Sequence, residues 1–488
     1  MKKTILLAAI IVMLTSCADE FLKEKPYSTI APETFYNNDQ DAEAATLAIY
    51  NAIYMNAGLF RSIIAVFPES SSDLFIANPA ASVAGREMAD FLYNSESTNV
   101  KSAWTDTYDC IKRANSVIDN LMRNVPVSAD AKSKLTGEAK FGRALMYYYL
   151  VQLFGDVPLV TSEVKSLDNI DLPRKPASEV WSQIVADLTD AISTLPEKSQ
   201  YQGVHKARAS KGAARILLAK VYMTLGKWPL ALKQIDDIIS SKEYALQPDI
   251  RTVFQVAYEN GLESIFEAQY ITGLSIKAGS SCFAYFVPGT PFSGFQTLFV
   301  NEKMIAKYDK NSVRYKAFFT DKGSYTGLDG KVIKTGYPQY FLYKLYDVYR
   351  PAGILKSTFN DYEFNFRIFR YADVLLMKAE CENEINGPND AGLNALNAIR
   401  SRAGEAIIPL SSVGSKNQFR ETIFLERAME LIGEGHRWYD LKRLGESTMI
   451  QKIKEAKGID VQAYQLLWPI PNSELKISKV LLQNPGWQ

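Results

Sequence analysis

Apolar residues recur at helical spacing along much of the chain and predict long amphipathic helices. Residues 101–122 place Trp104 and further apolar side chains three or four positions apart, and residues 129–154 repeat the pattern. Residues 176–195 continue it, with Val180 and Ile184 in i, i+4 register. Each segment therefore predicts a helix that buries one face against its neighbours.

Two later segments are joined by a turn centred on glycine. The helical pattern of residues 207–225 stops at Gly226, and the chain resumes with Trp228 and Ala231. A glycine supplies the left-handed cap that ends a helix, and a small alanine lets two helices approach closely. This Gly-x-Trp-x-x-Ala pattern resembles the turn of a tetratricopeptide repeat.

A second unit of this kind lies late in the chain. Apolar residues of 371–385 share one face, the pattern ends at Gly387, and Pro388 is predicted to start the next helix, which closes at Gly404. Such units cannot bury their apolar faces alone. We therefore expect several helix pairs to stack into a scaffold.

Two long stretches between helices are rich in turn formers and aromatic residues. Residues 67–99 carry many Ser, Ala and Asn, and residues 270–350 contain 18 Phe and Tyr. Ordered loops of this length are usually functional. The ligand site, if there is one, is expected on these two stretches.

Composition and charge exclude several classes of protein. The chain has 55 Lys and Arg against 54 Asp and Glu, so no strong field favours nucleic acid. Only His205 and His436 are present, and no nucleophile elbow, phosphate-binding glycine loop or His-Glu-x-x-His helix occurs. We expect no enzymatic activity, cofactor or metal site; His436 beside Glu434 lacks the nucleophile that a catalytic role would need.

The first residues resemble the leader of a bacterial lipoprotein. Two lysines precede ten apolar residues, too few to cross a bilayer as a helix, and the sequence Leu-Thr-Ser then leads to Cys17. The lipobox resemblance implies that residues 1–16 are removed and that Cys17 is acylated. Of the other cysteines, Cys110 and Cys381 fall on apolar positions of predicted helices and are expected to be buried free thiols, whereas no pattern indicates the state of Cys282.

Several longer motifs resemble the SusD/RagB family of outer-membrane nutrient-binding lipoproteins. They are LFGDVPLV at 153–160, RYADVLLMKAE at 370–380, GEGHRWYDLKR at 433–443, WPIP at 468–471 and QNPGW at 483–487. The resemblance implies a mainly α, SusD-like fold with tetratricopeptide-type helix pairs behind a loop-rich ligand-binding face. It implies a single domain over residues 17–488, with an N-terminal region of about 17–240 intertwined with a C-terminal region of about 241–488.

The resemblance also implies a function and a partner. Proteins of this kind sit over a SusC-like TonB-dependent transporter at the outer membrane, lipid-anchored and facing the cell exterior, and deliver an oligosaccharide. Capture of peptides or another nutrient, and a lipid-tethered scaffold that binds only protein, remain alternatives. A hydrolase ranks last.

Candidate ligand contacts follow from the chemistry of sugars. A sugar ring presents apolar faces and hydroxyl edges, so its site needs aromatic and planar polar side chains. The two loop stretches offer both, and Tyr325 is expected at an exposed loop tip; simple burial is the alternative for each aromatic. The candidates are Asp73, Phe75, Asn78, Arg86, Phe283, Tyr285, Phe286 and Tyr325.

One long motif is expected to be structural. Gly433 and Gly435 permit a tight turn between two helices. Across this turn we expect Arg437 to pair with Glu426 or Glu430, with the aromatic residues that follow packed beneath.

Overall fold

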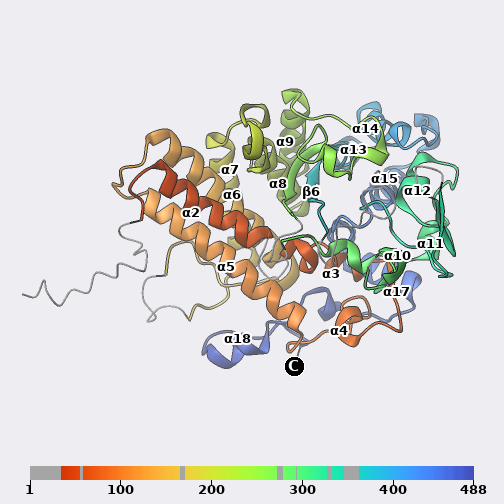
Figure 1. Ribbon diagram of the computed structural model, residues 1–488, viewed down its shortest axis with the longest axis horizontal. Coiled ribbons are helices and arrows are strands. Elements are labelled where there is room, and N and C mark those ends of the chain that lie inside the picture. The colour runs from red at the N-terminus through yellow and green to blue at the C-terminus, as the bar shows by residue number, and fades with distance from the viewer. Residues whose placement is uncertain are drawn as a thin grey trace, which may run out of the picture.

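Long helices lie side by side in chain order and form one continuous layer across the molecule (Figure 1). The computed structural model describes residues 35–54, 59–164, 171–271, 278–292, 294–326, 331–345 and 362–487. The layer comprises α2 (Asp39–Tyr54), α5 (Thr98–Leu121), α6 (Ala129–Phe154), α7 (Ala177–Thr194), α8 (Lys211–Thr224), α9 (Trp228–Ser241), α13 (Tyr371–Asn386), α14 (Asp390–Arg402) and α15 (Lys416–Leu431). The predicted mainly helical scaffold of packed helix pairs is confirmed.

Helix boundaries follow local capping chemistry and differ from the prediction at two places. Residues Gly203–Ala207 form a separate 3-10 helix, so α8 begins only after Ser210, whose hydroxyl accepts from the backbone N–H of Ala213. Pro388 does not start α14. Asn389 caps that helix instead, accepting from the backbone N–H of Gly392, because an amide oxygen satisfies a free N–H group and proline has no equivalent acceptor.

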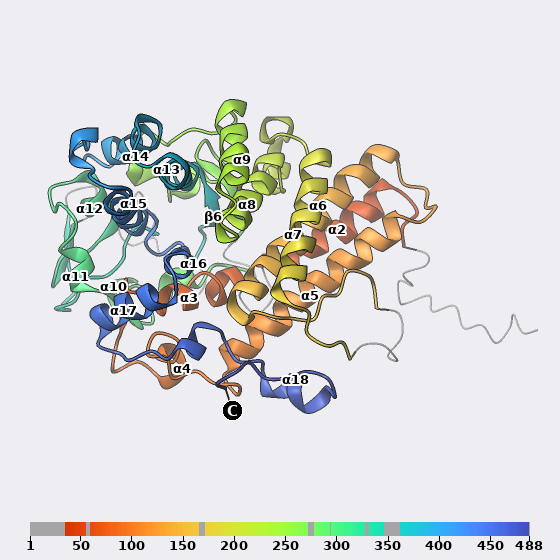
Figure 2. The ribbon, with the colours of Figure 1, turned by 180° about the vertical axis from the view of Figure 1, so that it is seen from behind.

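The remaining elements are short and lie mostly opposite the helical layer, as Figures 1 and 2 show. They include the π-helix Leu59–Ile63, α3 (Phe67–Ser70), α4 (Val83–Arg86), α10 (Gly289–Phe292), α11 (Glu302–Ile305), α12 (Val313–Phe318), α16 (Arg437–Arg443), α17 (Glu446–Lys457) and α18 (Asn472–Ile477). Within the described ranges, three two-stranded antiparallel sheets pair β1 (Phe75–Ala77) with β3 (Leu298–Val300), β2 (Ser264–Ala268) with β6 (Phe366–Arg370), and β4 (Ser324–Thr326) with β5 (Val332–Lys334).

The β1–β3 pair joins the two loop stretches that are far apart in sequence. Phe75 lies opposite Val300, and the pairing ends with Ala77 opposite Leu298. Just beyond the pair, the backbone N–H of Asn78 donates to the carbonyl of Thr297 at 2.8 Å. Both stretches therefore contribute to one face of the molecule.

A network of buried charges holds the C-terminal helices together. Arg370 donates to Glu434 at 2.6 Å, to Glu263 at 2.7 Å and to Glu430 at 2.9 Å, and all four side chains are buried. Burial opposes the ionisation of Glu430, but the neighbouring guanidinium groups of Arg402, Arg370 and Arg314 hold its pKa at about 2. Glu430 is therefore charged at neutral pH and depends on these arginines.

The sulfur chemistry is simple. Cys110 and Cys381 are buried free thiols, as predicted, and so is Cys282. Residues 1–16 and Cys17 lie outside the described residues.

Among the residues that are described, no helix combines the length and apolar character needed to cross a bilayer, and no group of three His, Cys, Asp or Glu could hold a metal ion.

His436 gives the protein a predictable response to acid. Burial is the main cause that lowers the pKa of His436 from 6.5 to about 4. Between these two values the unfolded chain binds a proton that the folded chain excludes, so stability is lost as the pH falls from 6.5 towards 4. We expect the free energy of unfolding of the wild type to fall by about 3 kcal/mol relative to that of His436→Gln across this interval.

Urea unfolding of both proteins at several pH values measures this difference. His205→Gln is the matched control, because it makes the same replacement at the other histidine of the chain, whose side chain is half exposed. A stability difference between wild type and His436→Gln that does not vary with pH would contradict the assignment.

Candidate functional site

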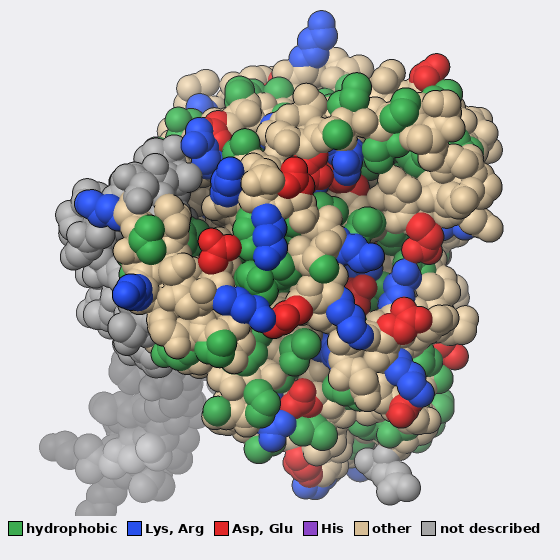
Figure 3. Space-filling model, turned by 90° about the vertical axis from the view of Figure 1, so that its right-hand side faces the viewer, with side chains coloured by type: hydrophobic (Ala, Val, Ile, Leu, Met, Phe, Trp, Pro, Cys, Tyr) green, Lys and Arg blue, Asp and Glu red, His purple; other side chains and the backbone are tan. Residues whose placement is uncertain are grey.

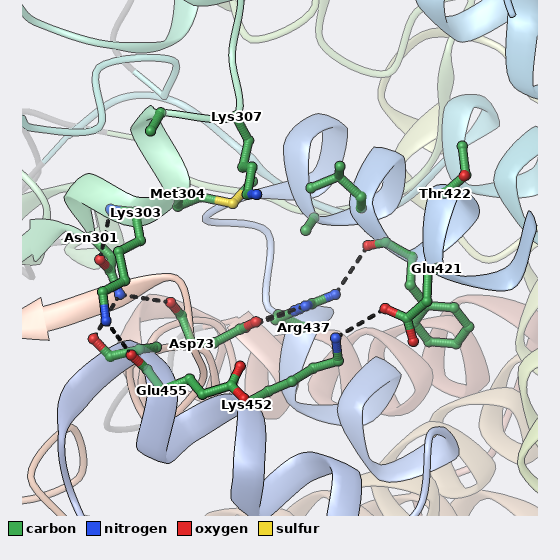
Figure 4. Close-up of a pocket in the computed structure, with 15 residues that line it drawn as sticks. Asp73, Asn301, Lys303, Met304, Lys307, Glu421, Thr422, Arg437, Lys452 and Glu455 are labelled. Atoms are coloured by element: carbon green, nitrogen blue, oxygen red, sulfur yellow. Dashed lines mark hydrogen bonds and ion pairs between the residues drawn. The ribbon is translucent and has the colours of Figure 1, made fainter. Parts of the chain in front are cut away.

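A pocket of about 780 Å³ opens where α11, α15 and α17 meet the start of α16 (Figure 4). We call it the α11–α17 pocket. Its walls include apolar surface from Met304, Phe424 and Leu425 and a rim of charged and polar groups. A volume of this size lies within the range of pockets that bind small molecules.

An ion pair forms the floor of the pocket. Arg437 donates twice to the carboxylate of Asp73, with both nitrogen–oxygen distances at 2.7 Å, and once to the carbonyl of Phe424 at 3.0 Å. Such a bidentate pair is geometrically fixed. The expected pairing of Arg437 with Glu426 or Glu430 is wrong, because those carboxylates bind Arg314, which reaches them from α12.

The turn before Arg437 is built from glycine, as predicted. Gly433 and Gly435 have φ angles of +78° and +76°, which residues with a Cβ rarely adopt. A Cβ on Gly433 would lie 2.2 Å from Leu342. The carboxylate of Glu69 accepts from the backbone N–H groups of Gly433 and Arg437, while burial raises its pKa to about 7.

The rim of the pocket carries three lysines in different situations. Lys452 pairs with Glu421 at 3.0 Å across the opening. Lys303 donates to the backbone carbonyl of Glu455. The ammonium of Lys307 is exposed and has no hydrogen bond or ion pair with any described residue. The rim thus offers hydrogen-bond donors to a ligand.

Asp73 is the predicted site residue that lines this pocket. Asn78 and Arg86 are partly exposed but lie outside it. The side-chain amide of Asn78 donates to the carbonyl of Gln296 at 2.8 Å, and Arg86 pairs with Asp90 at 2.6 Å. These polar candidates therefore border the β1–β3 face, with part of their surface accessible.

Most of the predicted aromatic candidates belong to the core. The ring of Phe75 packs 4.9 Å from that of Phe286, and Phe283 lies 5.2 Å from Tyr362. All three candidates are buried, so none offers an exposed platform in this structure. Enrichment of a loop in aromatic residues thus produced a packed loop rather than an aromatic surface.

The predicted position of Tyr325 is wrong. Tyr325 lies within β4 and is only 4% exposed, with its ring centroid 3.9 Å from that of Tyr343. Side chains alternate between the two faces of a strand, and this one faces inward. Tyr285 is half-buried, with its ring 5.5 Å from Phe67, and keeps part of its side chain accessible.

The sequence-based candidates did not include the three rim lysines or Arg437. Lys303 and Lys307 lie four positions apart in a segment with many lysines, and this charge pattern was the available signal. Arg437 carried no local signal, because its partner Asp73 is 364 residues away. Glu434, which is close to His436 in the sequence, is bound by Arg370 and Lys344 in the buried network.

Comparison with known proteins identifies the family. The model of the SusD family matches residues 285–487, and a model described as starch-binding associating with outer membrane matches residues 20–223. SusD-like protein P25 of Formosa agariphila is 29% identical, and the alignment covers 97% of this chain and 96% of that protein. The starch-binding protein SusD of Bacteroides thetaiotaomicron is 23% identical over 72% of each chain.

A solved structure supports the same conclusion. The structure of a laminarin-binding SusD-like protein superposes with a TM-score of 0.78 at 27% identity, covering 93% of this chain and 100% of the other. Both halves of the sequence and the helical architecture therefore indicate the same family. The chain belongs to the SusD/RagB family of non-catalytic, outer-membrane-associated glycan-binding proteins.

Proposed function

We propose that the protein captures an oligosaccharide at the cell surface and delivers it to a SusC-like TonB-dependent transporter in the outer membrane. Relatives are described as binding starch and laminarin, which supports a glycan as ligand. The α11–α17 pocket is the observation that carries the proposal, since it is open and combines apolar and polar walls.

The walls of the pocket suit a sugar ring. Leu425 and the small accessible part of Met304 offer apolar surface to the C–H faces of a pyranose, while the hydroxyl of Thr422 and the rim lysines can bond its hydroxyl edges. Asp73, fixed by Arg437, contributes carboxylate oxygens to the floor. A longer glycan would extend onto the β1–β3 face.

That neighbouring face carries the other accessible candidates. Asn78, Arg86 and Tyr285 keep part of their surface exposed beside the β1–β3 pair. We propose that they contact ligand units beyond the pocket. Phe75, Phe283, Phe286 and Tyr325 would support this face from beneath, because their side chains are buried.

The partner and the anchor belong to the same proposal. A binding protein supplies neither a pore nor energy, so uptake requires a transporter in the same membrane. Acyl chains on Cys17 would hold the protein there, facing the exterior. We propose that residues 17–488 form a single domain that acts as one capture unit.

Blocking the pocket tests the proposal. Ala306 is exposed and lines the pocket, so Ala306→Trp fills the opening without removing an interaction of the fold. We expect a loss of at least about tenfold in affinity, equivalent to about 1.4 kcal/mol. The measurement is calorimetric titration of residues 18–488 with host, plant and microbial glycans and with mixed peptides.

Ala186→Trp, an exposed position on α7, is the matched control and should bind as wild type does. If Ala306→Trp also binds normally and Tyr285→Ala does not, the ligand lies on the β1–β3 face instead. Peptide binding alone would favour the alternative nutrient. Absence of any saturable binding would favour a protein-interaction scaffold.

A further inference from the structure

Positive charge is concentrated next to the pocket although the whole chain is almost neutral. Residues 302–334 contain eight Lys and Arg against four Asp and Glu, whereas the full sequence has 55 against 54. This segment forms α11, α12, β4 and β5. Figure 3 shows the side of the molecule on which these elements lie, where Lys and Arg side chains project around hydrophobic surface.

The cations of this segment are mostly exposed and only partly neutralised. Arg314 is buried in the ion-pair network, but the seven lysines are exposed. Lys322 pairs with Glu302 at 2.7 Å, and Lys310 donates to the hydroxyl of Tyr340 at 3.1 Å. Within the described part of the chain, Lys307 has no ionic partner.

The acidic groups of the pocket are largely neutralised by other cations. Asp73 is paired with Arg437 and Glu421 with Lys452. Glu455 accepts from the side-chain amide of Gln451 at 2.7 Å and is the remaining carboxylate among the lining residues. Lys303 and Lys307 remain: Figure 4 shows Lys307 reaching into the opening and Lys303 at its edge, where the ammonium donates to the carbonyl of Glu455. The mouth therefore carries a small excess of positive charge.

We propose that the α11–α17 pocket selects anionic oligosaccharides, whose carboxylate or sulfate groups are bound by Lys303 and Lys307. This inference rests on the proposed function and adds the charge of the ligand to it. An ammonium group attracts an anion even in water, and the attraction decays over about 8 Å at physiological salt. A neutral sugar gains nothing from this electrostatic attraction.

The two lysines are well placed to act together. They lie four residues apart, with Lys303 in the short helix α11, Lys307 two residues beyond its end and Met304 between them in the sequence on the pocket wall. An anionic group can therefore contact a lysine while the adjoining ring covers Met304. Each ammonium can donate three hydrogen bonds, so sulfate and carboxylate oxygens are both suitable acceptors.

The test compares matched glycans that differ only in charge. One pair is oligogalacturonate and its methyl ester, and the other is sulfated and unmodified laminarin. By calorimetry at about 20 mM salt we expect the charged member of at least one pair to bind at least about tenfold more tightly. Raising the salt to about 500 mM should remove most of that advantage.

Variants locate the charge effect. Lys303→Ala combined with Lys307→Ala should lower affinity for the charged glycan at least about threefold and leave the neutral one unchanged. The control is Lys227→Ala with Lys233→Ala, which removes the same charge from α9 and its start. Equal loss in both double variants would show a diffuse charge effect and overturn the assignment to the pocket.

Other outcomes separate this inference from the function on which it rests. Equal affinity for charged and neutral members would overturn charge selection but leave glycan capture intact. Failure of every glycan to bind wild type, in this test and in the wider panel, would overturn both.

Discussion

Replacing Arg370 by methionine is expected to lower the free energy of unfolding by about 3–5 kcal/mol, the usual effect of removing one partner from a buried ion pair. The guanidinium is 1% exposed and binds Glu263, Glu430 and Glu434. Methionine fills a similar volume, so the loss would reflect carboxylates left without their cation. Urea unfolding followed by circular dichroism gives the change.

An exposed pair on the same protein provides the control. The Arg251 and Asp249 side chains are 42% and 32% exposed and lie 2.6 Å apart. Arg251→Met should therefore change stability by less than about 1 kcal/mol. If Arg370→Met were no more harmful than Arg251→Met, the buried network would not be holding the C-terminal helices together.

Cys17→Ala is expected to remove the protein almost completely from the membrane fraction. Without the thiol no diacyl group can be attached, and a protein carrying a single chain already binds membranes only marginally, with an association constant of about 10⁴ M⁻¹. Metabolic labelling with a fatty-acid analogue, followed by fractionation, measures both acylation and retention.

Ser16→Ala is the matched control for this change. It keeps a small residue before the cysteine, so the variant should remain labelled and membrane-bound. Retention of unlabelled Cys17→Ala protein in the membrane fraction would contradict a lipid anchor at this position.

The helical scaffold was predictable because its signals are local. Val180 and Ile184 lie one turn apart in the sequence, and Gly226 marks a helix end with its own φ of +68°. Where the prediction erred, at Pro388, two capping candidates lay within two residues and the stronger acceptor, Asn389, prevailed. Errors of this kind shift a boundary and leave the element in place.

The site was much less predictable, because its contacts are distant in sequence. The loop around Asp73 indicates that residue as a candidate, but the nearest acids to Arg437 in sequence lie on the preceding helix, and nothing near Arg437 indicates a partner 364 residues away. The burial of Tyr325 was also not predictable from the sequence. Alternation along a strand shows that neighbouring side chains face opposite sides, but it does not show which side is covered.

The same long separation determines when the pocket can exist during synthesis. Contacts between neighbouring helices can form while the chain is still emerging, whereas contacts between distant residues close large loops and form slowly. The floor needs residue 437, and the rim needs residue 452, to meet residues 73 and 303. A truncated chain can therefore fold part of its helical layer and still lack the pocket, so the pocket is a property of completed molecules only.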